Sequence, residues 1–142
     1  MASYRLKRNG SGTLKSAPNL CGDTHRAHMS DFKRLAVWKA SHDLVLKIYQ
    51  QTGSFPRHEL FGLTGQMRRA AVSISANIAE GRGRDTDRDF ARFITMSIGS
   101  VNELEYFLIL AKDLGYNNSP QNATDLASLG RRLQRFRSTL RP

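Results

Sequence analysis

The most constraining feature of this sequence is a helical spacing of apolar residues that runs from Phe32 almost to the C-terminus. Near the C-terminus, large apolar residues recur three or four positions apart, at Leu126, Leu129, Leu133 and Phe136. Spacing of this kind places the apolar side chains along one face of an α-helix. No stretch shows the strict alternation and the hairpin turns that strands require. The sequence therefore predicts an all-α fold.

Residues that start and stop helices divide this region into four segments. The expected helices are Leu35 to Thr52, Arg57 to Glu80, a third that runs to Gly115, and a fourth from Pro120 onward. We expect Gly53 to take the left-handed conformation that often follows a helix end. We expect Asp85 or Thr86 to cap the third helix and Ser119 to cap the fourth. Because the connections are short, the pattern predicts an antiparallel up-down four-helix bundle.

The third helix is more apolar than a single bundle needs. At 100° per residue, its apolar side chains span about 240° of the helix circumference. A helix that packs within one bundle needs an apolar arc somewhat above about 100°. The surplus includes Met96, Phe107, Leu110 and Leu114. Either the ends of the other helices or another subunit would have to cover it, and we favour self-association.

Residues 1–30 form a separate segment, rich in Gly, Ser, Asn and basic residues and without helical or strand spacing. We expect this segment to be a disordered basic tail, and residues 31–142 to be the bundle domain. Met29-Ser30 stands directly before the first patterned residues. The tail is therefore either an arm that binds nucleic acid or sequence upstream of the true start of translation.

The chain is strongly basic, with 22 Lys and Arg against 12 Asp and Glu and a formal net charge of +10. This charge points to polyanionic partners such as nucleic acid. The single cysteine, Cys21, excludes an internal disulfide and a cysteine-cluster metal site, and it favours a reducing, cytoplasmic setting. No apolar run reaches the roughly 18 residues of a membrane-spanning helix, so we expect no membrane association.

The arginines gather on the second helix, around the turn that follows it, and on the fourth helix. The last cluster has no acidic residue after Asp125, so its charges repel one another unless an anion is present. Arginine also suits bidentate contacts to phosphate. In preference to a merely solubilising role, we predict a surface that binds nucleic-acid phosphates. It consists of Arg68, Arg69, Arg82, Arg84, Arg131, Arg132, Arg135 and Arg137.

The aromatic residues are predicted to lie in the core rather than among the arginines. The aromatic residues that fall on apolar stripes are Trp38, Phe90, Phe93, Phe107 and Phe136. Stacking on unpaired bases would then have no platform. Binding is therefore expected to show weak sequence preference and a steep dependence on salt.

A polar stripe borders the apolar face of the second helix. It contains Gln66, Ser73, Asn77 and Glu80, and the third helix adds Ser100 and Glu103. We favour a hydrogen-bonded seam between helices or subunits that fixes their register. The alternative is a ligand site or active site lined by Asn77, Glu80 and Glu103.

No residue pattern typical of catalysis or of metal binding is present. His58-Glu59 has no second histidine at helical distance, and the Glu-x-x-His pairs of carboxylate-bridged metal sites are missing. The serines within the helices are far in sequence from any histidine that could act as a base. Gly81-x-Gly83 lacks the lysine of a phosphate-binding loop. We therefore expect no enzyme activity, no metal and no cofactor.

An ordered series of short motifs gives the chain a resemblance to a known family. The series is Phe32 with Leu35 and Trp38, Phe55-Pro56 with Glu59 and Leu63, Gln66 to Ile74, Asn77 to Gly81, Gly99-Ser100 with Glu103 to Glu105, and Leu114 to Tyr116. The chain resembles small bundle proteins encoded by intervening sequences in bacterial large-subunit ribosomal RNA genes, which are related to accessory proteins of diversity-generating retroelements. Two positions depart from the family pattern: Ser75 replaces a common proline, and Ser97 a common alanine.

The resemblance implies an up-down four-helix bundle, often a ring-shaped homopentamer, with no known catalytic activity. It also implies a basic surface that meets nucleic acid and a nucleic-acid-handling partner protein. Our first hypothesis is a non-enzymatic, oligomeric bundle that binds RNA or DNA through arginines of the second and fourth helices. The alternative is a homo-oligomeric scaffold that binds a protein and uses its charge only for solubility.

Overall fold

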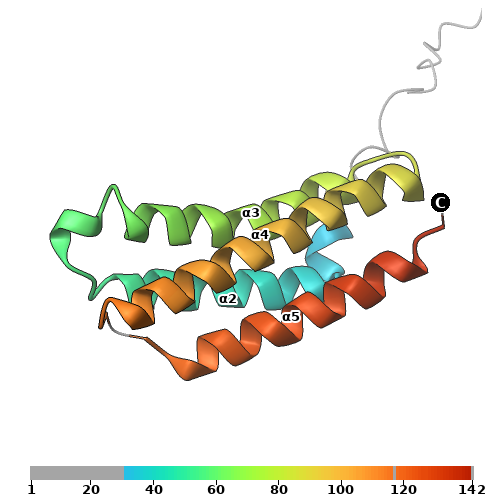
Figure 1. Cartoon of the computed structure of the whole chain (residues 1–142). Helices are drawn as coiled ribbons and strands as arrows, with labels where there is room; N and C mark the ends of the chain where they lie inside the picture. Colours follow the sequence, from blue (N-terminus) through green and yellow to red (C-terminus); the bar gives the residue numbers. More distant parts are fainter. Residues whose placement is uncertain (1–30, 117, 142) are drawn as a thin grey trace, which may run out of the picture.

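The computed structural model describes residues 31–116 and 118–141, which form a bundle of four α-helices (Figure 1). The helices are α2 (Ala36–Thr52), α3 (Leu63–Arg82), α4 (Asp87–Asp113) and α5 (Pro120–Thr139). Two short 3-10 helices, η1 (Asp31–Arg34) and η2 (Arg57–Glu59), precede α2 and α3. No strand occurs in these residues, and the predicted all-α fold is confirmed. The predicted tail, residues 1–30, lies outside the described part of the chain.

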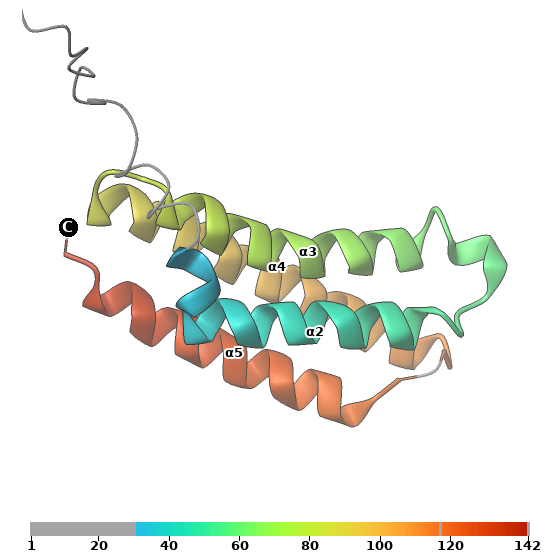
Figure 2. The same ribbon diagram turned by 180° about the vertical axis from the view of Figure 1, so that it is seen from behind.

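Successive helices run in opposite directions, and each packs against the one before it, with α5 closing the bundle on α2 (Figures 1 and 2). This arrangement confirms the predicted antiparallel up-down bundle. The four apolar faces meet in a core whose innermost side chains are fully buried, among them Ile48, Ile74, Ile94, Leu104 and Leu133. Burial of each such side chain contributes about 1.5–3 kcal/mol to folding, so the core holds the helices together.

The predicted bounds of the second helix and the predicted conformation of Gly53 are wrong, whereas the first helix ends at Thr52 as predicted. The second helix begins at Leu63, not at Arg57, because the Glu59 carboxylate accepts a hydrogen bond from the Leu63 N–H at 2.9 Å and caps the helix there. Gly53 has a φ of −62°, so it is not left-handed. Among the described residues, only Gly115, just after α4, has a positive φ, of 74°.

The predicted start of the third helix is confirmed at Thr86. The Thr86 hydroxyl accepts a hydrogen bond from the Asp89 N–H at 3.1 Å, which satisfies one of the free donors at the start of α4. Ser119 stands at the corresponding position before α5, where its side chain makes no capping hydrogen bond. Pro120 follows it at the first helical position, where its fixed φ suits a helix start.

Glu59 also ties the start of α3 to the end of α4, because its second carboxylate oxygen accepts a hydrogen bond from the Tyr116 hydroxyl at 2.9 Å. The hydrogen bonds from the Leu63 N–H and from Tyr116 lower the pKa of Glu59 below its ordinary value. A carboxyl whose pKa is lowered by folding stabilises the fold above its unfolded-state pKa, about 4.3, and loses that contribution as the pH falls through the folded-state value.

We therefore expect Glu59→Gln to be less stable than the wild type at pH 7, with the difference shrinking below about pH 4. Urea unfolding of both proteins at pH 7 and at about pH 3 measures this difference. A gap in unfolding midpoint that does not change with pH would show that the ionised carboxylate does not provide the stabilisation.

Helix α4 remains unusually apolar on its outside. Among the helices of the described residues, it alone is long and apolar enough to cross a membrane, by length and composition only. Its apolar residues do not form an unbroken run of spanning length. Its inner face packs in the core, and Phe107 and Leu110 are partly covered by the bundle. Met96 and Leu114 stay half exposed. The other helices of the bundle thus cover only part of the extra apolar surface that was predicted for this helix.

Candidate nucleic-acid interface

Helix α5 carries its arginines on the outside because its apolar residues face the core. Leu126, Leu129 and Leu133 are buried against the other helices. Arg131 and Arg135, one turn apart, are exposed and line a shallow surface hollow. Gln134 and Ser138 complete this hollow. Neither residue was predicted, although their spacing of three and seven residues from Arg131 places them on the same side of the helix.

The arginines of α5 have no acidic partners within salt-bridge distance in the described part of the chain. Arg132 donates to the main-chain oxygen of Ala36 at 3.1 Å, and Arg137 donates to the Thr95 hydroxyl at 3.5 Å. Both acceptors are uncharged, so neither contact neutralises the guanidinium. Four positive charges therefore stand close together on one helix, an arrangement that an anion would stabilise.

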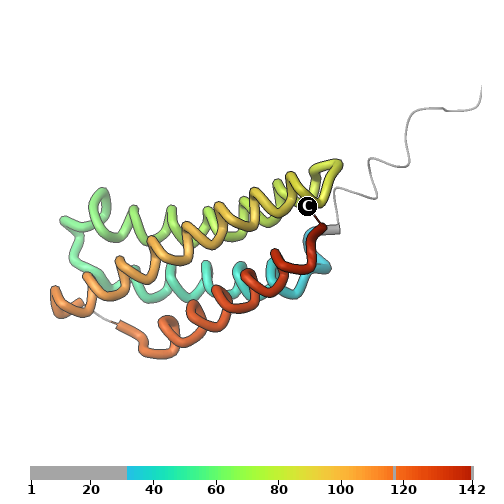
Figure 3. Tube along the Cα trace, turned by 45° about the vertical axis from the view of Figure 1, so that its right-hand side comes forward, coloured from blue at the N-terminus to red at the C-terminus, as the bar shows by residue number. Residues whose placement is uncertain are grey.

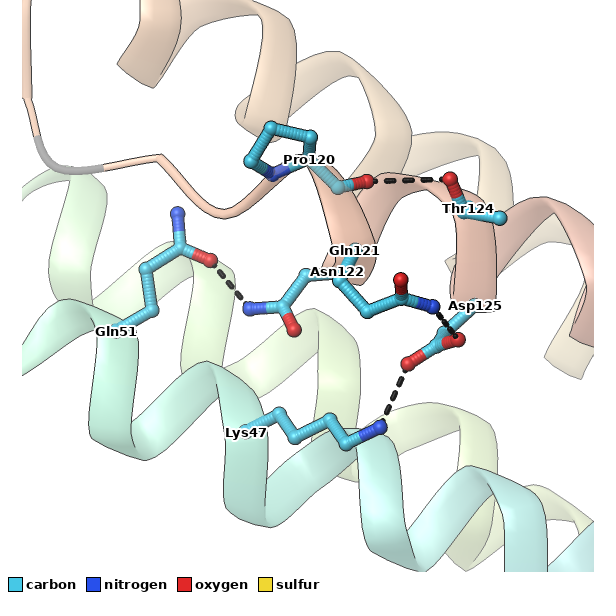
Figure 4. A network of polar contacts seen from close by, with 7 residues as sticks. All are labelled: Lys47, Gln51, Pro120, Gln121, Asn122, Thr124 and Asp125. Carbon is cyan, nitrogen blue, oxygen red and sulfur yellow. Dashed lines mark hydrogen bonds and ion pairs between the residues drawn. The ribbon is translucent and has the colours of Figure 1, made fainter.

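A polar network fixes the beginning of α5 on α2 (Figure 4). The Asn122 side-chain amide donates to Gln51 at 2.6 Å, and these two residues are only 4% and 5% exposed. Lys47 pairs with Asp125 at 2.6 Å, and Gln121 donates to the same carboxylate at 2.8 Å. The hydrogen bond from Lys47, followed by that from Gln121, lowers the pKa of Asp125. The last acid of α5 is thus already paired, one and a half turns before the arginines begin.

Arg68 and Arg69 lie toward the start of α3 and away from the arginines of α5, because α3 and α5 do not pack on each other and α5 begins at the end of the bundle where α3 also begins (Figure 3). Arg68 lies over the Tyr49 ring, with 4.6 Å from its Cζ to the ring centroid, and donates to the Thr52 hydroxyl. Arg84 pairs with Glu80 and lies 4.7 Å over the Phe93 ring. Arg69 is exposed and Arg82 is half-buried. Arg82 and Arg84 stand at the end of the bundle where α5 also ends, since the Arg141 N–H donates to the Asp87 carboxylate at 3.3 Å. Arg68 and Arg69 are therefore the predicted arginines that lie apart from α5.

The structure brings together three of the six residues of the predicted polar seam. The hydroxyls of Ser73 on α3 and Ser100 on α4 lie 2.9 Å apart. Asn77 donates to the Ser73 main-chain oxygen at 2.9 Å and to its hydroxyl at 3.1 Å. This cluster joins two helices within one chain. It contains no group that titrates near neutral pH and could act as a base.

The remaining residues of the predicted seam lie apart from this cluster. Gln66 and Glu103 are exposed, and the exposed Glu80 pairs with Arg84. Asn77, Glu80 and Glu103 consequently do not converge on a common point. Within residues 31–116 and 118–141, no group of three or more His, Cys, Asp or Glu side chains is placed to hold a metal ion.

The two departures from the family pattern both form hydrogen bonds between helices. Ser75 on α3 donates to the Ser41 hydroxyl on α2 at 2.9 Å. Ser97, which is fully buried on α4, donates to the main-chain oxygen of Ile74 at 3.0 Å. Each serine hydroxyl, partly buried at Ser75 and fully buried at Ser97, thus has a hydrogen-bond partner, which makes these substitutions compatible with the bundle.

Comparison with known proteins identifies the family of the chain. Residues 33–136 match the family described as 23S rRNA-intervening sequence protein. The match covers α2, α3, α4 and most of α5, and it includes Arg131, Arg132 and Arg135. Among curated proteins, no sequence matches the chain. With its four-helix architecture and this match over most of its length, the chain belongs to the 23S rRNA-intervening sequence protein family.

Proposed function

We propose that this protein is a non-enzymatic, cytoplasmic bundle that binds nucleic acid through the arginines of α5. The observation that carries the proposal is the pair of exposed guanidiniums at Arg131 and Arg135, which stand on a helix whose last acid, Asp125, is paired with Lys47. Membership of a family connected with ribosomal RNA makes RNA the first polyanion to test. Contacts to phosphate oxygens position a protein on nucleic acid without reading its sequence, so we expect weak sequence preference.

Self-association is part of the proposal. Tyr106 and Ile109 on α4 are half exposed, as are Met96 and Leu114, and exposed apolar surface of this kind is typical of contacts between subunits. The family resemblance favours a pentamer. Each added subunit would bring another set of α5 arginines, so assembly would raise the affinity for a long polyanion without any new type of contact.

A protein-binding scaffold is the second candidate, and one observation favours it. Phe61, in the connection between η2 and α3, is 92% exposed, and its neighbour Leu60 is half exposed. A large apolar side chain in this position is typical of a protein contact. A nucleic-acid-handling protein that docks there would make the two candidates compatible.

Filter binding of structured RNA and of duplex DNA at two salt concentrations tests the proposal. Neutralising four phosphates gives a log–log slope of about −2.8 to −3.6, because each phosphate contributes about −0.7 to −0.9. Affinity is therefore expected to fall about 50- to 150-fold between about 50 mM and about 200 mM salt. Absence of binding at the lower salt concentration, or binding that does not depend on salt, would contradict the proposal and favour the scaffold.

A further inference from the structure

Helices α2 and α3 lie side by side (Figure 2). Aromatic and apolar side chains of α2 form a row on the side toward α3, where Arg68 of α3 lies over the Tyr49 ring. Trp38, His42 and Tyr49 follow one another at intervals of four and seven residues, which return to nearly the same side of a helix. His42 is exposed, Tyr49 is 45% exposed, and Leu46 between them is 57% exposed. The row is therefore accessible from outside the bundle, unlike the aromatic residues of the core.

His42 and Trp38 form an ordered stack. Their ring centroids are 5.2 Å apart and their planes differ by only 5°. The edge of Phe32 packs against Trp38 from another direction, at 5.0 Å and 69°. The exposed His42 imidazole is therefore the outer ring of this stack, and its contact with Trp38 fixes the orientation of its plane. Binding of another flat ring there would cost little conformational entropy.

Tyr49 provides a second flat surface on the same side of the bundle. The Arg68 guanidinium lies over its ring at 4.6 Å and is held there by the hydrogen bond to the Thr52 hydroxyl at 2.9 Å. His42 and Tyr49 are seven residues apart, which corresponds to about 10 Å along a helix. That length is about three 3.4 Å base steps of a stacked strand.

The charges around this row suit a strand of nucleic acid. Helices α2 and α3 contain one acidic residue each, Asp43 and Glu80, and Glu80 is paired with Arg84. Exposed cations stand nearby on the same two helices, at Lys39 and Arg69. An apolar protein partner would not need this excess of positive charge, whereas phosphates between stacked bases would use it.

We propose that the α2/α3 face binds unpaired nucleobases of a single strand, which stack on His42 over Trp38 and on Tyr49 beside Arg68. The inference rests on the proposed function and adds that one face of the bundle selects single-stranded nucleic acid. It also replaces the prediction that stacking has no platform. That prediction placed Trp38 in the core, whereas Trp38 is half-buried. Tyr49, which the prediction did not consider, is exposed.

Two oligonucleotides of equal charge test this inference on the full chain. One is a single strand of about twelve nucleotides, within the usual range of single-strand sites, and the other is an abasic strand of the same length. The strand with bases is expected to bind tenfold or more tightly than the abasic strand, a difference of about 1.4 kcal/mol. Trp38 is the only tryptophan of the chain, so its fluorescence should fall with the first strand and not with the second.

A double variant with His42→Ala and Tyr49→Ala is expected to bring the ratio of the two affinities close to one and to leave binding of the abasic strand unchanged. Both side chains are exposed, so the bundle should still fold, which circular dichroism would verify. Gln50→Ala is the matched control, because Gln50 is equally exposed on α2 but points to another side of the helix. This control should keep the tenfold ratio.

The possible failures are distinguishable. Equal affinity of the wild type for both strands would overturn stacking and leave phosphate binding intact. No binding of either strand at low salt would overturn the proposed function as well. If an acidic peptide of equal charge quenched Trp38 and competed as strongly as the strand with bases, the face would be a protein-docking surface, and the inference would be wrong.

Discussion

Replacing Gly81 by alanine is expected to destabilise the bundle by about 2 kcal/mol, although alanine is the better helix former. Gly81 is buried inside α3, and a Cβ atom there would lie 2.6 Å from the Cβ of Phe93 and 2.7 Å from a ring carbon of Phe90. Contacts this short would push α3 and α4 apart. Overpacking at such a site costs up to about 3 kcal/mol, against a gain in helix propensity of at most about 1 kcal/mol.

Gly99→Ala is the matched control for Gly81→Ala. Gly99 lies within α4, where an added Cβ would meet nothing within 4 Å. Only the propensity gain then remains, so this variant is expected to be more stable than the wild type by up to about 1 kcal/mol. Chemical denaturation of both variants measures the two effects. Changes of the same sign would show that α3 and α4 do not approach each other at Gly81 as closely as described.

Replacing all four arginines Arg131, Arg132, Arg135 and Arg137 by glutamine is expected to lower the affinity for RNA at least tenfold at low salt. If each arginine neutralises one phosphate, the log–log salt slope should become shallower by about 2.8 to 3.6 units. Glutamine keeps part of the side-chain length, so the packing of α5 through its buried leucines should persist.

A second quadruple variant controls for the loss of net charge alone. Arg57, Arg88, Arg92 and Lys112 are exposed and are not among the arginines proposed to bind nucleic acid. Changing these four residues to glutamine removes the same charge and should leave the salt slope nearly unchanged. If both quadruple variants lost affinity and slope equally, the binding would depend on overall charge and not on α5.

Much of the fold could be predicted because apolar spacing is a local property of the sequence. The stripe of Leu126, Leu129 and Leu133 identifies both the buried side of α5 and the outward side that carries Arg131 and Arg135. Short connections then leave antiparallel packing as the simplest arrangement.

The errors arise where distant residues decide the local structure. The second helix was expected to end at Glu80, before Gly81, yet Gly81 lies within α3. The glycine is there because close packing against Phe90 and Phe93 needs a residue without a Cβ. The start of α3 depends on the Glu59 carboxylate, which Tyr116 also holds from the far end of α4. Neither contact can be derived from spacing alone.

The same limit applies to the candidate site. The eight arginines could be recognised as a basic set, but which of them lie near α5 depends on which helices are neighbours and where each one ends. The stack of Trp38 and His42 joins residues four apart on one helix, so helical spacing could have revealed it. The contact between Arg68 and Tyr49 joins two helices and requires the register of α2 against α3.

Covalent modification of arginines in the full chain, mapped by mass spectrometry with and without RNA, locates the phosphate-binding surface directly. At low salt, saturating RNA should protect Arg131, Arg135 and Arg137 strongly and leave Arg57 as reactive as in the free protein. Equal reactivity of the α5 arginines with and without bound RNA would contradict the assignment of this helix as the surface that binds nucleic acid.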